Sequence, residues 1–188
     1  MKTKNISQPA PHSEVIESSD PATQCFNYQL DFLKLEYESI NEIIKRVDEI
    51  TQTIKNWTLL IWAGSLSLAL GQTNFRQFVI LTAVLPLPFW FVDAWWRGIQ
   101  RTCIFRIRKI SEFLNGPSLA ESFQQQKLIN FKILDPRGLQ YRGSDEYKAY
   151  SHVGRTMRFK EVGGFYITLV AFSLLLGVLF IFLPQLRT

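Results

Sequence analysis

Three long uncharged apolar runs constrain the fold of this chain of 188 residues more than any other feature. Val162–Leu186 holds 25 residues without a charge, Asn56–Phe75 holds 20, and Gln77–Val92 holds 16. A helix needs about 20 predominantly apolar residues to cross the hydrocarbon core of a bilayer. The shortest run reaches that length if Asp93 is accommodated at the membrane boundary. The sequence therefore predicts an all-α membrane protein with a transmembrane hairpin over residues 57–96 and a third transmembrane helix over residues 162–186.

Clusters of Lys and Arg set the predicted orientation of these spans. They precede the first span (Lys45, Arg46, Lys55), follow the second (Arg97, Arg101, Arg106, Arg108, Lys109) and precede the third (Arg155, Arg158, Lys160). Positive charges gather on the cytoplasmic side of short loops. We therefore expect a multi-pass membrane protein with its N-terminus cytoplasmic and its C-terminus outside. The net charge of +5 then reports topology, and no direct nucleic-acid binding is expected.

The segment before the first span divides into two parts. Residues 1–25 are rich in Ser, Pro and acidic residues and predict a disordered tail. Residues 26–56 predict a cytoplasmic amphipathic helix whose apolar side chains recur three and four positions apart: Leu33, Tyr37, Ile40, Ile44, Val47, Thr51 and Ile54. Such a stripe must be buried. A second copy of the helix and the basic helix after the second span are both candidates to cover it.

Residues 97–161 predict a basic cytoplasmic helix followed by an insert. The helix that leaves the membrane at Trp96 is expected to run to Asn115, because Asn115-Gly116-Pro117 is typical of a helix end. The insert, defined here as residues 116–161, contains a second helix signal at Ser144, where SDEY resembles a capping sequence. We expect a helix that begins there to continue into the third span.

Small residues recur at helical spacing within the spans. Ala63, Ser67 and Gly71 share one face of the first span, and Gly164 with Thr168 and Ser173 with Gly177 recur in the third. Small side chains let helices approach closely in lipid, where apolar burial no longer drives association. These faces are candidates for packing within one chain or between subunits.

The second span contains the most unusual local sequence. Pro86 and Pro88 each remove a backbone donor and disfavour a helical residue before them, so we expect a kink near residues 85–87. Asp93 and Arg97 follow, four residues apart, and are expected to pair on one helix face. This junction is either an anchor at the membrane boundary or a gate.

Catalytic chemistry is not expected. The chain has no phosphate-binding glycine loop, no metal-ligand spacing and no nucleophile motif, so we predict no enzyme, catalytic residue, metal or cofactor. Six basic side chains of the insert form a candidate site for an anionic ligand: Arg137, Arg142, Lys148, His152, Arg155 and Arg158. With Tyr141, Tyr147 and Tyr150 they could grip phosphates and stack a base, or they could contact anionic lipid headgroups.

The order of the parts resembles a known family. A helix reading LDFLKLEYESINEIIKRVDEI runs into a tight transmembrane hairpin and returns through WWRGIQRTCIFRIRKISEFL. Over residues 26–115 this resembles the SLATT-like family of small bacterial membrane effectors, which is associated with nucleotide second messengers. The resemblance implies a pore-forming or membrane-perturbing effector of a bacterial inner membrane, acting in antiphage defence. The insert and the third span depart from the two-span pattern of that family.

The expected function is an oligomeric membrane effector. A cytoplasmic signal, either a nucleotide second messenger or a soluble partner, would shift the assembly from a closed to an open state. A non-conducting membrane anchor that recruits a soluble cytoplasmic partner is the alternative, and a constitutive small-solute channel is a third hypothesis.

Overall fold

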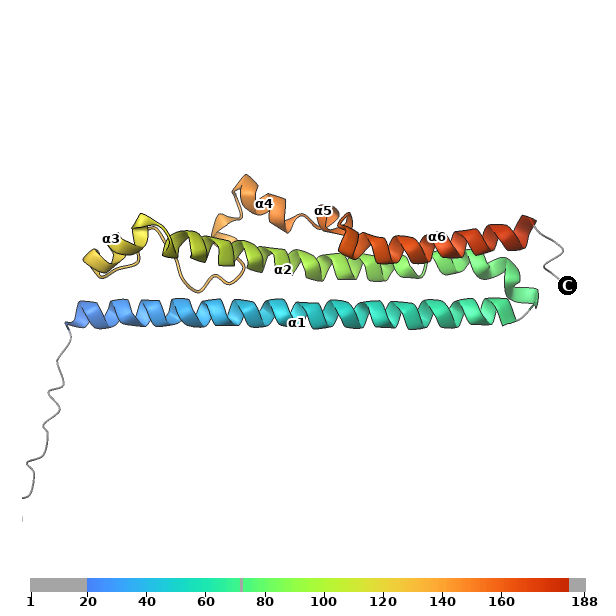
Figure 1. The fold of residues 1–188 in the computed structure, drawn as a ribbon, viewed down its shortest axis with the longest axis horizontal. Helices are drawn as coiled ribbons and strands as arrows, with labels where there is room; N and C mark the ends of the chain where they lie inside the picture. The colour runs from blue at the N-terminus through green and yellow to red at the C-terminus, as the bar shows by residue number, and fades with distance from the viewer. Residues whose placement is uncertain (1–19, 72, 183–188) are drawn as a thin grey trace, which may run out of the picture.

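The computed structural model describes residues 20–71 and 73–182, and every regular element in those residues is helical (Figure 1). The elements, in chain order, are α1 (Pro21–Gly71), the 3-10 helix η1 (Thr73–Ala83), α2 (Pro86–Leu114), α3 (Pro117–Gln125), the short 3-10 helix η2 (Leu139–Tyr141), α4 (Asp145–Ser151), α5 (Val153–Met157) and α6 (Lys160–Phe182).

The longest element is α1, a single helix of 51 residues. A helix of this length extends about 75 Å, because each residue adds about 1.5 Å. No proline interrupts it after Pro21, and proline is favoured in the first turn of a helix. Because the helix begins at Pro21, residues 21–25 are helical, and the prediction of a tail over residues 1–25 was wrong for them. Residues 1–19 lie outside the described part of the chain.

A long hairpin organises the remaining elements. In Figure 1, α1 runs the full length of the helical body, and η1 and α2 return beside it. The helix α3 lies near the end where α1 begins, α4 and α5 follow along α2 toward the middle of the body, and α6 runs beside α2 and η1 toward the end where α1 finishes. One half of the molecule is therefore a bundle of three helical segments, and the other half is the α1–α2 pair covered by the insert.

Two of the described helical segments are long and apolar enough to cross a membrane, Phe78–Leu114 and Lys160–Phe180. The predicted first span, Asn56–Phe75, is not one of them. It coincides largely with the C-terminal part of α1, where Trp57, Thr58, Trp62 and several Ser and Gly residues lower the hydropathy. The predicted third span coincides with α6 as far as Phe182, and its last residues lie outside the described part.

The two prolines lie at a change of helix type. The 3-10 helix η1 ends at Ala83, and α2 begins at Pro86, where a missing backbone donor has no structural cost. Eleven residues of 3-10 helix span about 22 Å, against about 16 Å for an α-helix of equal length. The 3-10 geometry therefore lengthens the shortest of the three apolar runs.

The amphipathic stripe of α1 is buried against α2. Leu33 and Ile40 form an apolar core with Cys103, Ile110 and Phe113, and insert side chains such as Phe131 and Ile133 pack on it. Of the two candidates for covering the stripe, the basic helix of the same chain therefore does so. Tyr37, expected on the stripe, is 44% exposed.

The insert contains no strand among the described residues and does not form one helix with the third span. Ser144 caps α4 as the sequence predicts, its hydroxyl accepting a hydrogen bond from the Tyr147 amide at 3.1 Å. His152 then takes an extended backbone (ψ 107°), which ends α4. The expectation that this helix continues into the third span was wrong, because α5 and a second break at Phe159 intervene.

The small residues of the spans divide into two groups. Ser173 and Gly177 are buried, and a Cβ on Gly177 would lie 3.0 Å from the Ile80 Cβ and 3.2 Å from its Cα. This pair packs α6 against η1 within one chain. Ala63, Ser67, Gly71, Gly164 and Thr168 are exposed on the surface of the single chain.

The close contact at Gly177 predicts a stability difference between two glycines of the same helix. Gly177→Leu is expected to destabilise the protein by about 1–3 kcal/mol, because η1 backbone atoms occupy the space the side chain needs. Thermal unfolding in a mild detergent measures this loss, because the melting temperature of a chain of this size falls by about 2–4 °C for each kcal/mol. Gly164→Leu is the control, because nothing lies within 4 Å of a Cβ there. Equal melting temperatures for the two variants would contradict the described packing of α6.

Candidate functional site

A fully buried ion pair joins the two long helices in the half of the molecule that carries the insert. Arg106 of α2 donates from Nε to Oε1 of Glu36 at 2.8 Å and from Nη2 to Oε2 at 3.2 Å. The side chains are 0% and 2% exposed. A bidentate guanidinium–carboxylate pair fixes both distance and orientation. The Glu36–Arg106 pair therefore sets the register of α1 against α2.

The same two side chains hold the insert. The Glu36 carboxylate accepts hydrogen bonds from the Leu134 amide at 2.8 Å and the Asp135 amide at 3.2 Å. Arg106 donates to the carbonyl of Lys132, and its guanidinium lies 4.5 Å from the centre of the Phe131 ring. Segment 131–135 is thus docked on the pair by main-chain bonds that do not depend on its side chains.

Sequence reasoning missed this pair because Arg106 was interpreted only as a topology charge. A signal was available in α1. Glu36 lies three residues after Leu33 and four before Ile40, so helical periodicity places an acid on the apolar stripe. An acid in a buried stripe requires a basic partner, since an unpaired buried charge is strongly unfavourable.

The three tyrosines of the insert surround a buried phenylalanine of α2. The Phe105 ring is 5.6 Å from Tyr141, 5.5 Å from Tyr147 and 5.3 Å from Tyr150, measured between ring centres. Burial raises the pKa of the Tyr147 hydroxyl. The rings thus contact Phe105, and the alternative that they stack a ligand base stays a prediction.

Close approach to that cluster requires a glycine. Gly138 adopts φ +64°, and a Cβ there would lie 3.2 Å from Phe105 Cδ1. Both the left-handed backbone and the short distance exclude most side chains. The DPRG turn of the insert is therefore fitted to the aromatic cluster.

The prediction that Asp93 and Arg97 form an ion pair was wrong. Arg97 Nη1 donates instead to Asp48 Oδ1 of α1 at 2.6 Å and to Gln100 Oε1 at 2.8 Å. A helix spacing of four residues permits a pair, but an acid on the neighbouring helix competes for the guanidinium. Asp93 is fully buried, and its nearest described cation is Lys55, whose Nζ lies 3.9 Å from Oδ2.

Asp93 and its neighbours form a polar group where three helices meet, here called the junction cluster: Lys55, Asp93, Glu161 and Tyr166. Lys55 of α1 donates to the main-chain carbonyl of Glu161 at the start of α6, at 3.1 Å. The buried Tyr166 hydroxyl faces the Asp93 carboxylate, but no described donor reaches either Asp93 oxygen with close hydrogen-bond geometry. Trp90 stacks on the Tyr166 ring at 6.2 Å. The cluster connects α1, α2 and α6 with few hydrogen bonds.

The interior of the three-helix bundle is closed by a small hydrogen-bonded group. Trp62 Nε1 donates to Ser173 Oγ at 2.8 Å, and Thr82 Oγ1 lies 3.1 Å from the same oxygen. Leu66, Val79 and Leu169 pack around them. These side chains fill the interior of the bundle at the level of Trp62, Thr82 and Ser173.

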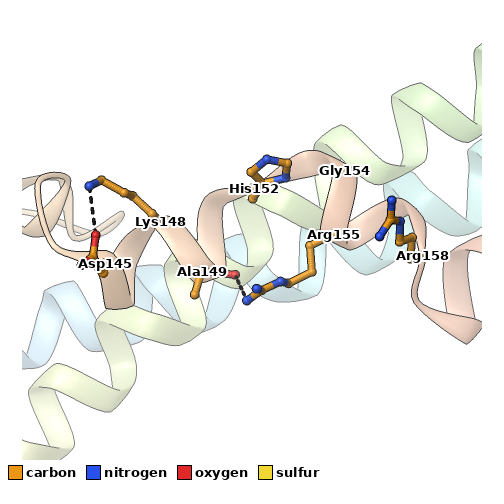
Figure 2. Close-up of a pocket in the computed structure, with 7 residues that line it drawn as sticks. All are labelled: Asp145, Lys148, Ala149, His152, Gly154, Arg155 and Arg158. Atoms are coloured by element: carbon orange, nitrogen blue, oxygen red, sulfur yellow. Dashed lines mark hydrogen bonds and ion pairs between the residues drawn. The ribbon is translucent and has the colours of Figure 1, made fainter.

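The six basic residues predicted to hold an anion are not gathered at one point. Lys148, His152, Arg155 and Arg158 line a cavity of about 480 Å³ together with Asp145. Figure 2 shows that the ends of Lys148, Arg155 and Arg158 are directed to different sides of it. Arg155 donates to the Ala149 carbonyl, and Lys148 pairs with Asp145 at 3.1 Å. Arg137 and Arg142 line a second cavity, of about 690 Å³, to which Lys148 also contributes.

Comparisons with protein-family models, curated proteins and solved structures each found no match. The class that the fold and these sites define is an all-helical protein with two helices able to cross a membrane. Any finer functional argument depends on the geometry of this chain.

The buried pair predicts a large loss of stability when one partner is removed. Arg106→Met leaves the Glu36 carboxylate buried without its cation, and such a loss costs about 3–5 kcal/mol. Arg108→Met, two residues along the same helix, is the control, because its ion pairs with Glu112 and Glu146 are exposed and worth at most about 1 kcal/mol. Chemical or thermal unfolding in detergent distinguishes the two variants. A loss of similar size in both would show that the Glu36–Arg106 pair does not stabilise the fold.

Proposed function

We propose that the protein is an oligomeric effector of a bacterial inner membrane, which forms or gates a pore, or perturbs the bilayer, in response to a cytoplasmic signal. In this proposal the C-terminal part of α1, the η1–α2 segment as far as Trp96, and α6 are three spans. The insert and the preceding halves of α1 and α2 lie in the cytoplasm, and the chain ends outside.

The observation that carries the proposal is the junction cluster. Buried carboxylates are normally hydrogen-bonded, and a polar group left without partners stores free energy that another arrangement can release. Asp93 is 0% exposed, the Tyr166 hydroxyl that faces it does not reach it with close hydrogen-bond geometry, and Lys55 is only in the outer range of an ion pair. An ionisable side chain at such a depth is by default a functional candidate. Its position where three helices meet favours a gate over a simple anchor.

Several copies are required for conduction. A single chain closes its own bundle with Trp62, Thr82 and Ser173, so a water-filled path has to form between chains. The exposed small residues Ala63, Ser67 and Gly71 offer a helix face on which another copy could approach closely. The resemblance to SLATT-like effectors agrees with this role and suggests antiphage defence as its setting.

Signals are expected to act through the insert. A ligand shifts a two-state equilibrium only if it binds the two states with different affinity. The insert contacts α1 and α2 through the Glu36–Arg106 pair and α2 through the Phe105 cluster, so a nucleotide or partner bound there would change how these helices lie. Both helices continue without interruption toward the junction cluster.

A non-conducting anchor that recruits a soluble partner is the second candidate function. A shallow apolar groove lined by Leu30, Leu33, Tyr37, Ile110 and Leu114 lies far from the proposed spans. Exposed Tyr28, Phe32 and Leu35 occur on the same stretch of α1. These side chains favour a protein partner at the cytoplasmic end, and they require no conduction.

Purified protein decides between the two functions. The effector is expected to show a mass of several chains in mild detergent and to release a small dye from liposomes. A monomer that never releases dye, under any condition that preserves the fold, would leave the anchor as the better description.

The junction cluster predicts a specific change in dye release. Asp93→Asn removes a buried charge that lacks a close partner, and we expect release to fall about tenfold, equivalent to roughly 1.4 kcal/mol of added preference for the closed state. Asp145→Asn is the matched control, since its carboxylate is 99% exposed and pairs only with Lys148 on the same helix. Release unchanged by Asp93→Asn, in a protein whose wild type does release dye, would exclude the junction cluster as the gate.

A further inference from the structure

A cavity between α2 and the insert combines positive charge with an apolar side. Its volume is about 690 Å³, within the range of sites that hold small organic ligands. The helix α2 contributes Trp95, Ile99 and Thr102, and the insert contributes Arg137, Arg142 and Lys148. The six side chains come from segments about 40 residues apart, which the packing of the insert on α2 brings together.

The cations of this cavity are largely free to bind an anion. Arg137 and Arg142 form no ion pair with any described carboxylate, and no acidic side chain is among the described residues that line the cavity. Lys148 pairs only with the exposed Asp145. Tyr147, also in the lining, has a hydroxyl that makes no hydrogen bond within the described part of the chain. Guanidinium groups and hydroxyls of this kind match the oxygens of a phosphate group.

The apolar side of the cavity lies where α2 is proposed to leave the membrane. Trp95 is 53% exposed and follows the buried Asp93 by two residues, and Leu139 of the insert, also in the lining, is 51% exposed. Tryptophan is enriched at the level of lipid headgroups. A ligand there would meet cations on one side and partly exposed apolar side chains on the other.

We propose that this cavity binds a phosphate ester, and specifically the headgroup of an anionic phospholipid held by Arg137, Arg142 and Lys148. The lipid source is favoured over a soluble phosphate because Trp95 and Leu139 provide an apolar wall at the membrane boundary. The inference rests on the membrane placement proposed above and not on conduction. The bound headgroup would link the insert to α2 close to the junction cluster. Lipid composition would then affect the gate proposed at that cluster.

The neighbouring cavity is less suited to this role. Asp145 lines it, and Figure 2 shows Lys148 and Arg155 bonded within the drawn group, to Asp145 and to the Ala149 carbonyl. A carboxylate in the wall repels a phosphate, and the cationic ends do not converge. The proposal is therefore confined to the cavity that Arg137 and Arg142 line.

Native mass spectrometry of the full chain in neutral detergent tests the proposal directly. Phosphatidylglycerol and phosphatidylcholine are supplied in equal amounts. We expect the wild type to retain phosphatidylglycerol with at least a roughly tenfold preference, as two or three charge-assisted hydrogen bonds would give. The variant Arg137→Gln/Arg142→Gln is expected to lose that preference. Equal retention of the two lipids by the wild type would overturn the proposal.

The control variant removes the same charge from other exposed positions. Arg46→Gln/Lys160→Gln takes away two cations that line neither cavity, and we expect the phosphatidylglycerol preference to remain. If this control loses the preference as fully as the cavity variant, the binding is diffuse attraction to the basic surface and the site is disproved.

A neutral variant tests the cavity itself. A Cβ on Gly98 would meet only Val153 Cγ2, at 3.8 Å, so Gly98→Leu is expected to fold and to fill the cavity while every charge remains. Lost phosphatidylglycerol preference with an unchanged melting temperature supports the site. Full retention by a folded Gly98→Leu protein would contradict it.

Inorganic pyrophosphate separates the two sources of phosphate. We expect that it does not displace the bound lipid, because it has no apolar part to contact Trp95 and Leu139. Displacement would overturn the assignment to a lipid. The lipid experiment does not depend on pore formation. A chain that retains phosphatidylglycerol preferentially but releases no dye would support the lipid site and contradict the proposed conduction.

Discussion

The arrangement of this molecule depends on the buried pair between Glu36 and Arg106. It joins three segments that are remote in sequence, α1, α2 and residues 131–135. Its four described partners outside the pair all lie in residues 131–135: the Phe131 ring, the Lys132 carbonyl and the Leu134 and Asp135 amides. A buried ion pair is weak evidence for stability as such, because desolvation offsets much of the attraction. Its effect here is geometric, since a sliding of either helix by one turn would leave two opposite charges buried apart.

Three ion pairs join α1 to α2, and the order of their charges along the two helices reinforces that alignment. Glu36 with Arg106 and Asp48 with Arg97 both place the acid on α1 and the base on α2. At the third link the order reverses, because Lys55 of α1 faces Asp93 of α2. A shifted pairing would bring like charges together at one of these positions, which is how charge patterns exclude wrong alignments. The exposed Asp48–Arg97 link adds little stability but contributes to that selection.

The sequence predicted the parts of this fold that depend on local rules. Periodicity placed Leu33, Ile40 and Val47 on a buried stripe, and Asn115-Gly116-Pro117 and Ser144 fall at a helix end and a helix start. Long-range pairings did not follow from it. Arg97 had an acid four residues away, and only the tertiary structure offers it Asp48. Arg106 carried no local sign of burial, because the chain that covers it lies 25 residues further on. The six basic residues of the candidate anion site likewise line two different cavities, because the folding of the insert, and not their spacing in the sequence, decides which of them meet.

The three ion pairs between α1 and α2 differ in how completely their carboxylates are hydrogen-bonded. Glu36 is fully hydrogen-bonded, and Asp48 accepts a short bond from Arg97, whereas Asp93 faces the Tyr166 hydroxyl and Lys55 without a close hydrogen bond from either. Rearrangement therefore costs least at Asp93, beside the start of α6. Because α1 runs without a break from the Glu36 level to the Lys55 level, a displacement of the insert end is carried along a stiff helix to the least satisfied contact. The proposed conversion of cytoplasmic binding into movement of the spans needs this order of strengths, with firm contacts at the insert and weak contacts where α1, α2 and α6 meet.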